Sequence, residues 1–176
     1  PLAEYLAQRE ADPAFIGFHR IEYALWSEGT TEGLAPVAAD LATAAATVKD
    51  RLKQAKPGPA DLAGNAASLA ARVADQAAAS QTPYSHSDLA EYSADLDGIT
   101  KSAIVVEPLV REANPATADA LTSALEAARA TLDGLKVDGA FPSYDTVDDA
   151  GRKTISEAFA RIADAAGALN PAIGLE

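Results

Sequence analysis

Apolar side chains recur at helical spacing along most of this chain, and prolines and glycines separate the runs. The pattern predicts helices over residues 34–55, 60–79, 115–136 and from 145 or 146 to 169, together with a long helix that begins after Ser85 or Ser87 and ends near Ala113. Two series are expected to face a core: Leu34, Val37, Leu41, Val48 and Leu52, and Leu89, Tyr92, Leu96, Ile99, Ala103 and Val106. No run alternates as a strand would. The chain is therefore predicted to be all-α, an up-and-down antiparallel bundle of five to six helices in one domain over residues 1–176.

A further helix is predicted over residues 13–28, where Asp12-Pro13 provides a start and Gly29 a stop. On this helix His19 and Glu22 lie three residues apart, so their side chains share one face. Phe15 and Trp26 fall on the same stripe, and apolar residues surround the helix. We therefore expect the pair to lie inside the bundle, where a polar pair needs a partner.

That partner could be a metal ion, because imidazole and carboxylate groups that project into a helical bundle are common ligands of iron and manganese. The pair alone is weak support, since a hydrogen-bonded or ionic His-Glu pair in the core has the same spacing. A zinc peptidase would need His-Glu-x-x-His or His-x-x-Glu-His. Residue 23 is tyrosine and the other histidine, His86, is distant in sequence, so the peptidase is the less favoured interpretation.

The segment Pro83-Tyr84-Ser85-His86-Ser87-Asp88 is the second candidate. Ser85 and Asp88 resemble a capping box at the start of the long helix, where Asp88 would also complement the helix dipole. The functional alternative is that Tyr84, His86 or Asp88 closes the metal site from the start of a neighbouring helix.

Net charge and residue content exclude several classes of binding partner and site. The formal net charge of -12 argues against nucleic acid and anionic membrane surfaces, which attract basic proteins. The absence of cysteine removes disulfides, thiolate metal sites and cysteine nucleophiles. No run of 18 or more apolar residues occurs, so no membrane insertion is expected.

Two motifs carry a resemblance to a known family. Gly17-Phe-His-Arg-Ile-Glu22, followed by Ala24-Leu-Trp26, and later Pro83-Tyr-Ser-His-Ser-Asp-Leu89 with Asp97-Gly98, resemble the imelysin-like family in its EfeO/EfeM-type periplasmic iron-uptake branch. The resemblance covers nearly the whole chain. It implies a helical bundle with a Gly-x-His-x-x-Glu motif at a metal site, in a periplasmic or secreted protein of a family once grouped with metallopeptidases.

By that resemblance His19 and Glu22 are metal ligands. Further candidates are His86 and Asp88 of the second motif, and Glu10 and Asp12, which lie close to the first motif in the sequence. Iron is the implied metal, with zinc and copper as alternatives. The implied partners are the membrane permease and haem peroxidase of an Efe-type system. Other functions left open are a zinc metallopeptidase, an acidic-polysaccharide-binding protein and a structural helical module.

The chain also departs from the family pattern. Family members carry a further helical stretch upstream of the motif, and some carry a cupredoxin domain; neither is expected in these residues. Ser80-Gln81-Thr82 stands where relatives carry an acidic pair, which disfavours a second metal site there. The ligand set is therefore expected to be incomplete.

Overall fold

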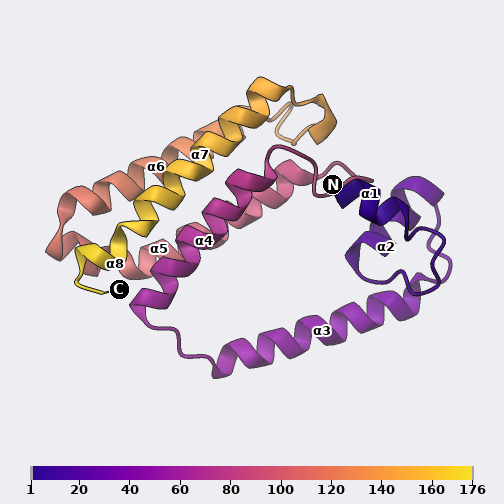
Figure 1. Cartoon of the computed structure of the whole chain (residues 1–176), viewed down its shortest axis with the longest axis horizontal. Coiled ribbons are helices and arrows are strands. Elements are labelled where there is room, and N and C mark those ends of the chain that lie inside the picture. The colour runs from indigo at the N-terminus through magenta and orange to yellow at the C-terminus, as the bar shows by residue number, and fades with distance from the viewer. Residues whose placement is uncertain (1, 176) are drawn as a thin grey trace. The chain divides into compact units, whose positions relative to one another are not determined.

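A computed structural model describes residues 2–175 (Figure 1), and the predicted all-α class is confirmed. The only pairing of strand type among these residues is an isolated bridge between Val137 and Ala140. The elements are α1 (Leu2–Ala7), α2 (Phe18–Tyr23), a π-helix η1 (Ala24–Glu28), α3 (Leu34–Gln54), α4 (Pro59–Gln76), α5 (Asp88–Ala113), α6 (Pro115–Asp133), a 3-10 helix η2 (Tyr144–Thr146), α7 (Asp149–Gly167) and α8 (Leu169–Ala172). No helix formed by residues 2–175 is long and apolar enough to span a membrane.

The chain divides into two compact units. The first contains the described residues up to Lys56 together with Gln81–His86, and the second contains Pro57–Ser80 and the described residues from Ser87 onward. The short segment Gln81–His86 thus belongs to the first unit although it joins α4 to α5, two helices of the second.

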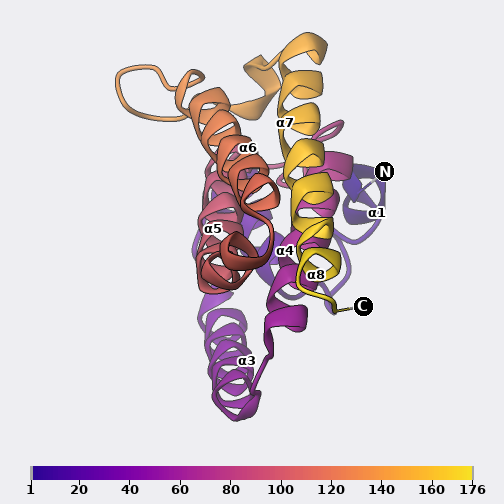
Figure 2. The same ribbon diagram turned by 90° about the vertical axis from the view of Figure 1, so that its left-hand side faces the viewer.

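The second unit is a four-helix bundle. Helix α4 packs on α5 and α7, and α6 packs on the same two helices, so the four close around one core (Figures 1 and 2). All six predicted core positions of α5 are buried: Leu89, Tyr92, Leu96, Ile99, Ala103 and Val106. Helix α4 contributes mostly alanines, and these small side chains allow its neighbours to approach closely.

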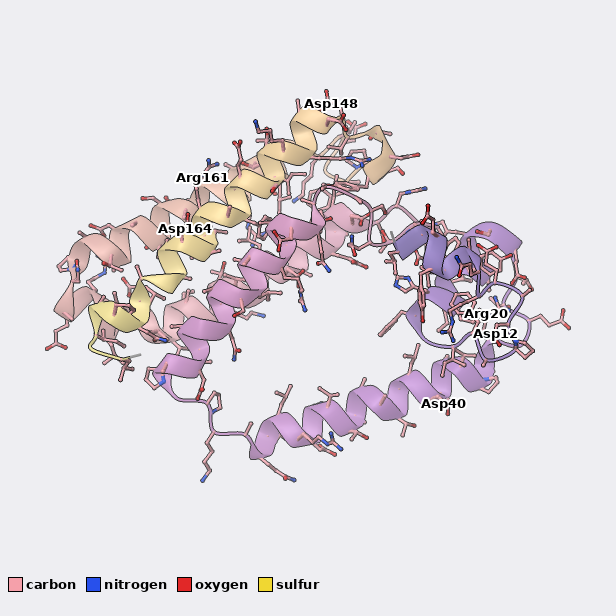
Figure 3. All side chains as sticks on the ribbon, viewed as in Figure 1. Asp12, Arg20, Asp40, Asp148, Arg161 and Asp164 are labelled. Atoms are coloured by element: carbon pink, nitrogen blue, oxygen red, sulfur yellow. The ribbon has the colours of Figure 1, made fainter. Side chains whose placement is uncertain are left out.

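Helix α7 has a side-chain cap at its start and one buried face. The Asp148 side chain caps it by accepting the Gly151 N–H at 2.7 Å, which satisfies one of the free donors of the first turn. Phe159 and Ile162 are fully buried in the core. Arg161 and Asp164 project from the opposite, solvent-exposed face (Figure 3).

The first unit departs from the predicted helix over 13–28, which begins instead at Phe18. The Asp12 side chain accepts the Ala14 N–H at 2.8 Å and the Asp12 carbonyl accepts the Phe15 N–H, so Asp12-Pro13 forms a turn rather than a helix start. Gly17 then takes a positive φ of 92°. The predicted stop is confirmed, because Gly29 ends η1 in the left-handed conformation.

The predicted aromatic enclosure of this helix is wrong for most of its members. Phe15 is buried, but Phe18 is 76% exposed and Trp26 is 59% exposed, and Ile16 is exposed as well. The pattern identified the apolar residues, but of the residues from Phe18 to Glu28 only Glu22 and Ala24 are buried.

Candidate metal centre

The predicted pair forms within the first unit. His19 and Glu22 both lie on α2, and the imidazole Nδ1 is 2.8 Å from the carboxylate Oε2. The Glu22 residue is 8% exposed, whereas the His19 side chain is 33% exposed. The carboxylate is therefore the inner member of the pair and the imidazole the outer one.

Glu22 is held by a segment more than 60 residues away in the chain. Its Oε1 accepts three hydrogen bonds, from the Tyr84 N–H at 3.2 Å, the Ser85 N–H at 2.9 Å and the Ser85 hydroxyl at 2.8 Å. Hydrogen bonds to a charged acceptor are among the stronger ones in proteins. This network supplies the partners that a buried carboxylate requires.

The local backbone of the 82–86 segment explains how two adjacent N–H groups reach one oxygen. The His86 N–H donates to the Thr82 carbonyl at 2.7 Å and closes a turn, and His86 itself has a positive φ of 51°. The N–H groups of Tyr84 and Ser85, which follow one another in this turn, both donate to Glu22 Oε1.

Tyr84 extends the network to Glu10, which lies in the turns after α1. Its hydroxyl donates to Glu10 Oε1 at 3.0 Å, and its ring packs against Tyr23 with centroids 5.1 Å apart. Burial, followed by the hydrogen bond to Glu10, raises the pKa of Tyr84 to about 12. Tyr84 is thus a neutral donor at neutral pH.

Arg20, the basic residue inside the motif, does not neutralise the pair. It forms an ion pair with Glu28 at 2.9 Å and lies over the Tyr23 ring. Figure 3 shows Arg20 and Asp12 in the first unit, among the turns near α2. Arg20 is therefore directed to Glu28 and Tyr23 rather than to the Glu22 carboxylate.

The other candidate ligands, Asp12, Asp88 and His86, have contacts of their own or lie in the other unit. Asp12 caps its own turn and is 4.0 Å from Arg9. Asp88 is completely buried in the second unit, where it accepts a hydrogen bond from the Ser80 hydroxyl at 2.7 Å. In the first unit, His86 has a buried Nδ1 without a hydrogen-bond partner among the described residues.

The role of Ser85 differs from the one that the sequence suggested. The long helix takes Ser87 as its N-cap residue, and the Ser85 side chain bonds Glu22 rather than the helix start. Nothing in the sequence around Ser85 indicates that its hydroxyl would bond Glu22, 63 residues earlier in the chain. The Gly-x-His-x-x-Glu and Tyr-Ser-His motifs nevertheless meet, through the hydrogen bonds from Ser85 to Glu22.

The donor set fits a cation in part. Among residues 2–175 no three His, Asp or Glu side chains gather closely enough to hold a metal ion. With Nδ1 engaged by Glu22, the His19 ring keeps Nε2 for a ligand, which is how many metal-binding histidines are arranged. The first unit therefore supplies one well-oriented imidazole and an adjacent carboxylate, and a complete site would need more ligands.

Comparison with known proteins gives the family. The family model described as Imelysin matches residues 2–169. This chain belongs to the imelysin family. Among curated proteins it is similar to the iron uptake system component EfeO of Escherichia coli strain K12 and to the protein of the same name from Shigella flexneri, at 29% identity over 170 residues in each case.

The aligned region covers 96% of this chain but 45% of each relative. The chain thus spans about half the length of the curated relatives that it matches. Both motifs, at residues 17–22 and 83–89, lie inside the region that the family model matches.

Proposed function

We propose that this chain is the metal-binding part of an iron-uptake component, and that it captures iron at the His19–Glu22 pair. The observation that carries the proposal is the pair itself: a carboxylate held by three hydrogen bonds, beside a histidine with one ring nitrogen left for a ligand. The names of the curated relatives support iron as the cargo. Imidazole and carboxylate groups also suit zinc and copper, which are the alternatives.

The proposal places the protein in the periplasm or outside the cell, as a binding protein without catalytic turnover. Carboxylates from other helices complete the coordination, since the pair alone offers too few ligands. Bound iron is then transferred to a membrane permease or a haem peroxidase of an Efe-type system. The formal net charge of -12 supports a cation as the cargo.

Calorimetric titration of Fe²⁺ under anaerobic conditions, with Zn²⁺ and Cu²⁺ in parallel, tests the site. We expect His19→Ala to weaken binding of the favoured metal at least about tenfold, because loss of a ligand or its orienting partner commonly costs that much. Asp40→Ala is the control, since it removes an exposed carboxylate of α3 that is not among the candidate ligands. Unchanged affinity in His19→Ala would show that the metal binds elsewhere.

A further inference from the structure

We infer that Glu22 is a positioning residue rather than a metal ligand: it holds His19 so that Nε2 faces the metal, and Ser85 with the Tyr84 N–H holds Glu22. This inference rests on the proposed function, because it assigns roles within the same site. It differs from the expectation in which both residues of the motif bind the ion.

The first step concerns Oε1 of Glu22. A carboxylate oxygen has two lone pairs, and this one already accepts three donors within 3.2 Å. Two of these donors are backbone N–H groups, which cannot rotate away without moving the chain. A metal at Oε1 would have to displace them and would leave two backbone N–H donors without an acceptor, which is unfavourable. Oε1 is therefore unsuited to a metal.

The second step concerns Oε2 and the tautomer of His19. Three donors point at Oε1, and with Oε2 also an acceptor the contact at 2.8 Å places a hydrogen on Nδ1. A neutral imidazole with its hydrogen on Nδ1 has its lone pair on Nε2. The partly exposed ring thus presents Nε2 outward, and Glu22 behaves as the carboxylate that orients a metal-binding histidine.

The third step extends the role to Ser85. Its N–H and hydroxyl provide two of the three hydrogen bonds that fix the Glu22 carboxylate. Removal of the hydroxyl leaves both backbone donors in place, so Glu22 keeps its charge and its general position but loses part of its restraint. Ser85 is therefore a second positioning residue, which acts on His19 through Glu22.

The tautomer can be measured without metal. Imidazole ¹⁵N shifts in long-range ¹H–¹⁵N spectra of the metal-free wild-type protein, recorded where histidine is neutral, should show His19 with its hydrogen on Nδ1. In Glu22→Ala the same ring should move toward the Nε2–H form that prevails in free histidine. The second histidine, His86, provides the internal reference. A wild-type His19 in the Nε2–H form would overturn the inference.

Affinity separates a positioning role from direct ligation. With Zn²⁺ as a redox-inert probe, Ser85→Ala should weaken binding about two- to fivefold and Glu22→Ala about 10- to 100-fold, both less than His19→Ala. Equal losses in Glu22→Ala and His19→Ala would make Glu22 a ligand. Ser85→Ala keeps the test usable if Glu22→Ala does not fold. If His19→Ala leaves the affinity unchanged, the proposed function fails. The tautomer measurement does not depend on that result, because it is made on the metal-free protein.

Discussion

At the residue scale, Gly17 decides where the motif helix begins. It has φ 92° and ψ -169°, a combination that is essentially restricted to glycine. This conformation turns the chain from the Asp12 turn into α2, and it precedes His19 by two residues. The glycine of the Gly-x-His-x-x-Glu motif therefore has a backbone role. A Cβ built at this position would have no neighbouring atom within 4 Å, so space is not the reason for glycine here.

Substitution of Gly17 by alanine should destabilise the protein by about 1–3 kcal/mol through backbone strain alone. Gly98→Ala is the matched control: Gly98 lies exposed within α5 and also has open space where a Cβ would be built. This control should gain about 0.5–1 kcal/mol from helix propensity. Urea unfolding followed by far-ultraviolet circular dichroism measures both, and equal changes of the same sign would contradict the backbone argument.

Residue-scale prediction from sequence succeeded where the contact is local. The spacing of His19 and Glu22 predicted that their side chains meet, and they do, at 2.8 Å. The hydrogen bonds from Ser85 and Tyr84 to Glu22 join residues more than 60 positions apart, and helical spacing carries no information about such pairs. The Gly17 conformation was missed because Asp12-Pro13 also matches a helix start.

At the scale of elements, α3 and α5 carry similar apolar series but differ in what covers them. The α5 series is buried throughout. On α3 only Leu34 is buried, and Val48 and Leu52 are exposed. These two residues line an open apolar groove of about 730 Å³ with Phe18 of α2 and Leu41. A 3.6-residue period shows which face of a helix is apolar, but not whether another element covers that face.

The same substitution on the two helices measures this difference. Leu96→Ala in α5 removes a completely buried side chain and should cost about 2–5 kcal/mol through lost burial and a cavity. Leu52→Ala in α3 removes a side chain that is 65% exposed and should change the free energy of unfolding by less than about 1 kcal/mol. Chemical denaturation of both variants tests the prediction. A large loss for Leu52→Ala would mean that another chain or a second copy covers the α3 groove in solution.

At the scale of the whole molecule, the fold class could be predicted but the division into units could not. Periodicity and punctuation gave an all-helical chain and most helix positions, because both depend on neighbouring residues. Gln81–His86 belongs to the first unit, where Ser85 hydrogen-bonds Glu22, and a contact between residues so far apart in the chain leaves no trace in helical spacing. Within the second motif the two ends differ: Ser85 hydrogen-bonds Glu22 of the pair, whereas Asp88 is buried in the other unit.

The net charge gives a prediction for the acidic-polysaccharide alternative. With 26 acidic and 14 basic residues the protein should repel a polyanion, and the repulsion is screened over a distance of about 10 Å at 0.1 M salt. Polygalacturonate in a chelating buffer at low ionic strength should therefore show no binding by light scattering or calorimetry. A cationic polymer such as polylysine should bind, and more weakly as salt increases.

Divalent cations should change that result, because a metal that bridges protein carboxylates to polymer carboxylates replaces repulsion with coordination. Titration of Ca²⁺ into the mixture, with neutral dextran as the control polymer, separates the two cases. If polygalacturonate binds in chelator, a built site must overcome the net charge of -12, and the polysaccharide alternative would gain over iron capture. If it binds only with the cation, the polymer competes for the carboxylates that a metal-binding protein would use.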